Sequence, residues 1–235
     1  NNVRQIKKFL SPNTELMAVV KADAYGHGAV KVARTALQSG ADALAIATLG
    51  EGIELRQSGI SAPILILGAI NTIEEIKAIA HWQLESTLSS PQQAILFSET
   101  LGSLNLSLPV HLKFDTGMSR LGINWELATE FVQLVISLPN LKLQSIYSHL
   151  ATADEIDSSI LNLQHQRFEE AIASLRSQGI NLPKLHLANS AATLRDRNLH
   201  YDLVRVGLVL YGLYPASHCT SAIDLQPVLQ VKARV

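Results

Sequence analysis

Short apolar runs alternate with amphipathic segments along almost the whole chain. The runs have the length of buried strands, and eight strands are expected, at residues 16–20, 42–48, 63–68, 84–87, 110–115, 143–149, 184–189 and 202–207. Between them, apolar residues recur at helical spacing, as in residues 29–40 and 157–179. Alternating strands and helices form a parallel sheet through right-handed crossovers, and continuously apolar strands fit burial on both faces. Eight such repeats predict a (β/α)8 TIM barrel.

The expected strand at residues 84–87 has the weakest pattern, because it is short and contains Glu85. If one or two of the eight strands are wrong, the alternative fold is a doubly wound parallel sheet.

The two ends of the chain have patterns of their own. Residues 1–10 carry apolar positions at helical spacing, with neither an initiator methionine nor a capping residue before them. Residues 225–235 alternate like a strand, with no partner strand after them. Both ends therefore look cut from a longer chain.

Composition excludes several classes of protein. The 235 residues are 47% hydrophobic and 17% charged, which is ordinary for a soluble globular protein with a large core. A net charge of −1 argues against nucleic acid or an acidic membrane as a partner. No apolar run approaches the roughly 20 residues that span a bilayer, and no secretion signal opens the chain. The single cysteine, Cys219, excludes an internal disulfide and predicts a reducing, cytoplasmic location.

Polar side chains gather where the expected strands end. In a barrel, the carboxyl ends of the strands and the loops after them form the face that carries the chemistry. A lysine that follows directly on a buried run, as Lys21 does, tends to lose its proton and become a nucleophile. The residues placed at this face are Lys21, Tyr25, Lys113, Arg120, His149, Asn189, Ser190, Arg205 and Gly207.

Several of these residues also have an ordinary structural interpretation. The alternatives are a solvent-exposed Lys21, a helix-capping Ser190, an Arg205 paired with Asp202 or Asp196, and a Lys113 paired with Asp115. His149 could be a metal ligand or a purely structural residue. Because the eight histidines show no metal-ligand spacing, no metal is expected.

Five stretches of the sequence carry a family resemblance. They are "VKADAYGHG", "HLKFDTGMSRLG", "YSHLATAD", "HLANSAATL" and "DLVRVGLVLYGLYP". In order and spacing they resemble the successive signature motifs of alanine racemase, over about residues 17–215. The resemblance implies a barrel that binds pyridoxal 5′-phosphate (PLP) and interconverts L- and D-alanine, which supplies D-alanine for peptidoglycan.

The resemblance also implies roles for individual residues. Lys21 would bind PLP as a Schiff base and move a proton on one face of the substrate. The phosphate would be held by Tyr25, Ser190, Gly207 and the backbone of Leu208, with Asn189 also at the cofactor. Arg205 would face the pyridine nitrogen, and because a guanidinium only donates, that nitrogen would stay unprotonated.

Three further roles follow from the same resemblance. His149 would lie against the cofactor ring and bond to Arg205. Arg120 presents a planar fork that suits the substrate carboxylate. Lys113 would be carbamylated and orient Arg120.

Racemisation needs an acid or base on each face of the substrate, and Lys21 serves one. In the family the opposite base is a tyrosine from a second, β-rich domain of the partner subunit of a homodimer. The expectation is therefore a PLP-binding barrel over residues 1–225, with residues 226–235 as the start of a truncated C-terminal β domain. Two alternatives stay open: a serine racemase of the same family, and a single-barrel PLP-binding protein of cofactor homeostasis.

Overall fold

The computed structural model describes residues 1–220 and 222–233, and its centre is a ring of eight parallel strands. These are β1 (Glu15–Val19), β2 (Ala43–Ile46), β3 (Ile64–Ile66), β4 (Glu85–Leu88), β5 (Leu108–Asp115), β7 (Leu141–Tyr147), β8 (Lys184–His186) and β9 (Leu203–Val206). They lie in the order β8-β7-β5-β4-β3-β2-β1-β9. Backbone hydrogen bonds from Asp202 to Leu185 and from Arg205 to Ala188 join the two ends of this path. The predicted (β/α)8 barrel is confirmed, and the doubly wound alternative is wrong.

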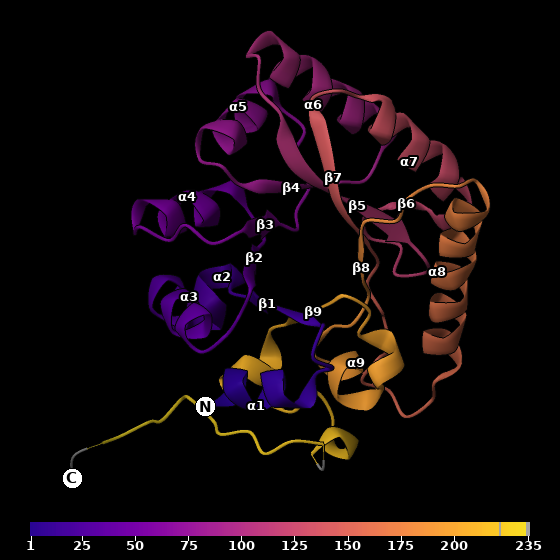
Figure 1. Ribbon diagram of the computed structural model, residues 1–235. Coiled ribbons are helices and arrows are strands. Elements are labelled where there is room, and N and C mark those ends of the chain that lie inside the picture. The colour runs from indigo at the N-terminus through magenta and orange to yellow at the C-terminus, as the bar shows by residue number, and fades with distance from the viewer. Residues whose placement is uncertain (221, 234–235) are drawn as a thin grey trace.

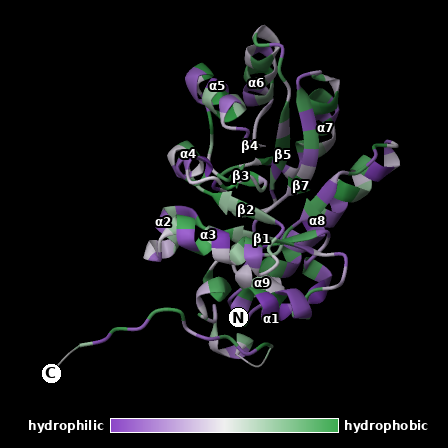
Figure 2. Ribbon diagram, turned by 60° about the vertical axis from the view of Figure 1, so that its left-hand side comes forward, coloured by the Kyte–Doolittle hydropathy of each residue, from purple (hydrophilic) through white to green (hydrophobic). Residues whose placement is uncertain are grey.

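Helices surround the strands (Figure 1). They are α1 (Asn2–Phe9), α2 (Lys21–Gly26), α3 (Ala29–Gln38), α4 (Leu49–Gln57), α5 (Ile73–His81), α6 (Pro91–Ser103), α7 (Ala128–Ser137), α8 (Ser159–Ser177) and α9 (Ser190–Arg195). Thr48, Thr72 and Ser90 accept hydrogen bonds from the first turns of α4, α5 and α6, which fixes where these helices begin. Figure 2 shows mixed polar and apolar colouring on the outer helices, as expected for helices with one face on the strands.

Five short elements complete the described part of the chain. One is a two-residue strand that pairs with β5, and the others are single turns of 3₁₀ helix: β6 (Ile123–Asn124), η1 (Trp125–Leu127), η2 (Arg197–Leu199), η3 (Leu208–Tyr211) and η4 (Ser217–Cys219). In the described ranges, no helix is long and apolar enough to cross a membrane.

The interior of the barrel has an apolar part and a polar part. A cluster separate from the main core fills the apolar part: Met17, Val19, Ala43, Ala45, Leu65 and Leu203. The polar part lies on β4, β5, β7, β8 and the far end of β9, with Thr87, His111, Lys113, Ser145, His186 and Arg205 buried there. The register places Thr87, His111 and Ser145 side by side on one face of the sheet. Since buried polar groups are costly without partners, this half of the interior must form a bonded network.

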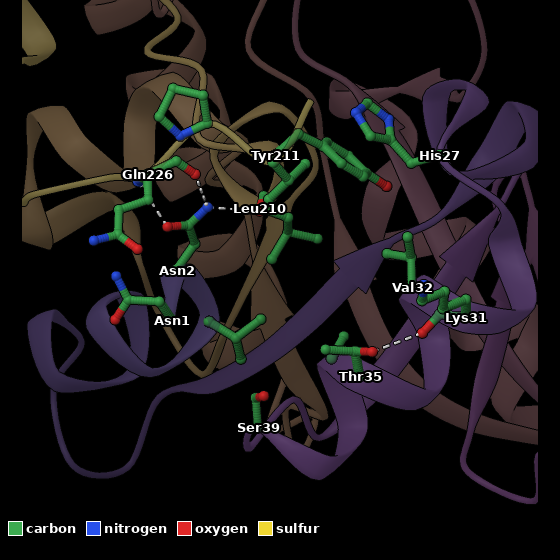
Figure 3. Close-up of a pocket in the computed structure, with 14 residues that line it drawn as sticks. Asn1, Asn2, His27, Lys31, Val32, Thr35, Ser39, Leu210, Tyr211 and Gln226 are labelled. Atoms are coloured by element: carbon green, nitrogen blue, oxygen red, sulfur yellow. Dashed lines mark hydrogen bonds between the residues drawn. The ribbon is translucent and has the colours of Figure 1, made fainter. Parts of the chain in front are cut away.

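The C-terminal segment leaves the barrel beside the N-terminal helix. The Asn2 amide donates to the carbonyls of Leu210 and Gln226 and accepts from the Gln226 backbone N–H, at 3.0, 2.8 and 2.9 Å. Figure 3 shows this asparagine between the two segments, at the edge of a cavity of about 450 Å³. Residues 226–233 form no strand, so the strand expected over residues 225–235 is wrong for that range; residues 234–235 lie outside the described residues.

Candidate active site

A cavity of about 530 Å³ opens at the carboxyl ends of the strands. Ten residues singled out in the sequence line it together: Lys21, Tyr25, Lys113, Arg120, His149, Asn189, Ser190, Arg205, Gly207 and Leu208. They come from loops and strand ends that lie far apart in the sequence, so the barrel brings them to one place as its topology requires. Tyr147 at the end of β7 and Asp154 in the following loop also line it.

The backbone after Lys21 has an unusual conformation. Residues 22–25 have φ between 51° and 54° and ψ between 36° and 53°, which makes a left-handed turn of four non-glycine residues. Such backbone costs roughly 1–2 kcal/mol per residue, so the surroundings must hold it. The Glu51 carboxylate does so, because it accepts from the N–H of Ala22 at 2.6 Å and of Ala47 at 2.7 Å. Asp23 accepts from the Ala29 N–H at 2.7 Å and fixes the far end of the turn.

The loops that follow β8 and β9, on the same side of the ring as β1, meet through a hydroxyl. Ser190 Oγ, at the start of α9, accepts from the backbone N–H of Gly207 at 3.0 Å. The helix cap is the neighbouring Asn189, whose side chain accepts from the Ala192 N–H, so Ser190 is not the capping residue. A Cβ atom at Gly207 would lie 2.6 Å from the Tyr25 hydroxyl oxygen. The backbone of Gly207 and the hydroxyls of Ser190 and Tyr25 thus converge closely enough to hold a small anion.

Arg205 is buried in the barrel beneath these loops, with 4% of its surface exposed. Its guanidinium donates to His186 Nδ1 at 2.7 Å and to the Ser148 carbonyl at 2.6 Å, and it lies 4.8 Å from the centre of the Tyr147 ring. Burial lowers the pKa of Arg205 to about 10, so the side chain stays charged at neutral pH.

The alternative interpretation of Arg205, a surface ion pair with Asp202 or Asp196, is wrong. Asp202 accepts from the Leu185 N–H, and Asp196 from the Asn198 N–H.

His149 lies on the cavity wall, but the hydrogen bonds of Arg205 go to His186 and to backbone carbonyls rather than to His149. Burial and the Arg205 and Lys113 cations lower the pKa of His149 to about 3. His149 is therefore a neutral imidazole at neutral pH. Within residues 1–220 and 222–233, no group of three or more metal-binding side chains is placed to hold a metal ion.

Lys113 points into the cavity from β5 and is 7% exposed. Burial, together with the Arg205 and Arg120 cations, lowers its pKa to about 8. The alternative pairing with Asp115 does not form an ion pair, because Asp115 Oδ1 accepts instead from the N–H groups of Gly117 and Ser119, each at 2.9 Å. The cavity wall thus carries four basic side chains, Lys21, Lys113, Arg120 and Arg205, with Asp154 as its carboxylate. This charge suits a ligand that bears a phosphate and a carboxylate.

Comparison with known proteins identifies the family. A model of the alanine racemase N-terminal domain matches residues 1–215. The chain belongs to the alanine racemase N-terminal domain family. Curated alanine racemases of Nostoc sp. and Synechocystis sp. are each 63% identical to it, across the whole of this chain and 61% and 63% of their own lengths. The chain therefore spans less than two thirds of these relatives.

Solved alanine racemase structures have the same fold. The enzyme of Clostridium difficile in complex with cycloserine matches 96% of this chain and 62% of its own, with a TM-score of 0.91 and 34% identity. The Bacillus anthracis enzyme with bound L-Ala-P matches with a TM-score of 0.89 and 36% identity.

Two residues that shape this site were missed in the sequence analysis. Glu51 had a local signal, because Thr48 and Glu51 have the spacing of a helix capping box. The sequence signal for His186 is weaker. It is one of eight histidines, and only the register of β8 places it inside the barrel.

Proposed function

We propose that this chain is the PLP-binding barrel of an alanine racemase that interconverts L- and D-alanine. The observation that carries the proposal is the joint placement of Lys21, the Ser190–Gly207 contact and Arg205 on one cavity of a chain 63% identical to curated alanine racemases. The relatives are named alanine racemase, which favours alanine over serine and a racemase over a PLP-homeostasis protein.

The residues present fit PLP. Tyr25, Ser190 and the backbone of Gly207 and Leu208 supply hydroxyl and N–H donors for its phosphate, and the cradle they form is one that a Cβ at Gly207 would fill. Lys21 supplies the amine for its aldehyde. Arg205, charged and without acceptor capacity, would face its pyridine nitrogen and keep that nitrogen unprotonated. PLP, when bound, supplies an electron sink for the negative charge at the substrate Cα.

The remaining residues would orient and deprotonate the substrate. Arg120 would hold the carboxylate with its planar fork, oriented by a carbamylated Lys113. The lowered pKa of Lys113, about 8, leaves part of its amine neutral, the form that reacts with carbon dioxide. Lys21 would move the Cα proton on one face.

The second base is proposed to come from outside this cavity. His149, with a pKa of about 3, and Tyr147, whose pKa burial raises to about 12, are poorly matched to proton transfer at neutral pH. A tyrosine from a C-terminal domain of the partner in a homodimer would fill this role, with residues 226–235 leading into that domain. The lone Cys219 supports the proposal that the protein works in the reducing cytoplasm.

The test is covalent capture of PLP followed by an activity assay. The chain is mixed with PLP, reduced with borohydride and digested, and the modified peptide is identified by mass spectrometry. The adduct is expected on Lys21. Chiral chromatography of D- and L-alanine then measures racemisation by a protein that also contains the C-terminal domain. Absence of any adduct, or an adduct elsewhere, contradicts the proposal.

Tyr25→Phe and Ser190→Ala are each expected to weaken PLP binding. Each removes one donor to a charged phosphate, a loss of about 1–3 kcal/mol. Titration of PLP by absorbance or calorimetry measures the change. Ser177→Ala, at the exposed end of α8, is the matched control and should leave affinity unchanged. Unchanged affinity in both test variants would place the phosphate elsewhere.

Gly207→Ala is expected to weaken PLP binding through Tyr25. The new Cβ would meet the Tyr25 hydroxyl at 2.6 Å and displace it, so the loss should match the roughly 1–3 kcal/mol of one charged hydrogen bond. Both changes remove the same contact. Gly207→Ala should therefore reduce the PLP binding free energy much less in the Tyr25→Phe background than in the wild type. Gly50→Ala is the control, since a Cβ there meets nothing within 4 Å. Additive losses would contradict this account of the cradle.

A further inference from the structure

A row of bonded polar side chains crosses the interior of the barrel. Glu85 Oε2 lies 2.8 Å from His111 Nε2, and His111 Nδ1 lies 2.6 Å from Ser145 Oγ. Ser145 Oγ lies 2.6 Å from His186 Nε2, and His186 Nδ1 lies 2.7 Å from an Arg205 Nη atom. We call these five residues the polar row. Their strands, β4, β5, β7, β8 and β9, are neighbours around the ring.

The polar row joins two cavities. Arg205, at one end, lines the cavity of about 530 Å³ that also holds Lys21. The other members line a second cavity, of about 220 Å³, with Glu15 and Lys184 on its wall. Glu15 and Lys184 begin β1 and β8, so this second cavity lies at the amino ends of the strands. The row therefore runs from one mouth of the barrel to the other.

The chemistry of the two ends fixes the direction of every hydrogen bond. A guanidinium only donates, so His186 Nδ1 must be unprotonated and accept the hydrogen bond from Arg205. The ring proton of His186 therefore lies on Nε2, which donates to Ser145 Oγ. Burial holds the pKa of His186 well below its usual value, which keeps this ring neutral. At the other end the Glu85 carboxylate accepts, so His111 carries a proton on Nε2.

Ser145 links the two rings. If His111 is neutral, its Nδ1 is bare and accepts the single hydroxyl proton of Ser145. A doubly protonated His111 would instead donate to Ser145, whose own proton would then have no acceptor in the described part of the chain. The arrangement that satisfies every group has all protons pointing from Arg205 towards Glu85.

We propose that Glu85, His111 and Ser145 are positioning residues that hold His186 in the Nε2-protonated form and thereby fix the Arg205 guanidinium at the floor of the cavity. Arg205 has no carboxylate partner among the described residues, and Glu85 is the anion at the end of its chain of bonds. The part of this inference that concerns the cofactor rests on the proposed function, in which Arg205 faces the pyridine nitrogen.

The first experiment needs no cofactor. The 235-residue chain is labelled with ¹⁵N-histidine, and NMR distinguishes a bare from a protonated ring nitrogen. Both His111 and His186 are expected to be neutral, with the proton on Nε2. A proton on Nδ1 of His186, or an exchanging mixture of its two forms, would overturn the proposal.

A double-mutant cycle tests whether Glu85, at the amino ends of the strands, influences His186 through Ser145. Glu85→Gln keeps the acceptor but removes the charge, so it should shift the ring signals of both His111 and His186. In the Ser145→Ala background, the same change should still shift His111 but no longer His186. Glu15→Gln is the control, because it removes a carboxylate from the same cavity without touching the polar row. Equal shifts at His186 with and without Ser145, or the same shift in Glu15→Gln, would overturn the proposal.

The second experiment measures PLP affinity in the same variants. Glu85→Gln and Ser145→Ala are expected to weaken PLP binding about three- to tenfold, a typical coupling between residues in one hydrogen-bond network. Glu15→Gln should have no effect. Unchanged affinity in both test variants would overturn the positioning role. If PLP does not bind the wild-type chain, the proposed function has failed, whereas the histidine signals still decide the arrangement of the polar row.

Discussion

Replacing Lys21 with alanine is expected to abolish covalent capture of PLP. The adduct needs an amine within reach of a cofactor whose phosphate lies between Tyr25, Ser190 and Gly207, and Lys21 opens the left-handed turn that also carries Tyr25. Borohydride trapping and peptide mapping of the variant measure the loss, which should be nearly complete.

Lys113 is the rival nucleophile and therefore the informative control. It lines the same cavity, and its pKa of about 8 makes its amine neutral more readily than an ordinary lysine. Lys113→Met should still trap PLP on Lys21, and so should Lys184→Met at the opposite mouth. An adduct that survives Lys21→Ala and maps to Lys113 would reverse the two assignments.

Lys113→Met is expected to stabilise the chain at pH 7 by about 3 kcal/mol when carbon dioxide is excluded. The pKa of Lys113 falls from 10.5 to about 8 on folding, so the buried charge opposes folding, and each tenfold loss of proton affinity corresponds to about 1.4 kcal/mol. Because the folded chain binds fewer protons than the unfolded chain between about pH 8 and 10.5, wild-type stability rises across that window. The advantage of the variant should therefore shrink to about 1 kcal/mol by pH 10.

Denaturant unfolding at pH 7 and pH 10 measures this difference. Lys142→Met, on the exposed part of β7, is the matched control and should change stability by less than about 0.5 kcal/mol. Added bicarbonate should stabilise the wild type and not Lys113→Met, because a carbamate replaces the buried cation with an anion beside Arg120 and Arg205. A variant that is less stable than the wild type at pH 7 would contradict the cost assigned to this charge.

The barrel could be predicted from the sequence because β1, β2 and β3 are buried, mostly apolar runs and the other strands recur between helical segments. The polar residue in the weakest expected strand is explained by the polar row: Glu85 of β4 points inward and bonds to His111. The residues of the cavity could be predicted because the strand ends mark its place, and five motifs identified them.

Features that depend on contacts between distant segments could not be predicted. Nothing in the local sequence of residues 22–25 indicates four left-handed residues, which are held by Glu51 from the next βα unit. The partner of Arg205 was expected to be His149, whereas the register of β8 presents His186. Residues 225–235 alternate like a strand, but an alternating pattern forms a ladder only where another strand lies beside it.

Separation of β8 from β9 is coupled to ligand binding in the cavity. These are the neighbouring strands of the described ring that no regular ladder connects, and two backbone hydrogen bonds span them. Local opening of the ring here must also break the side-chain bonds of Arg205 to His186 and of Gly207 to Ser190. Ser190 follows one of these strands and Gly207 the other, so an anion gripped by both must be released before the junction parts. A ligand at a hundred times its dissociation constant would add about 2.7 kcal/mol to the free energy of that opening.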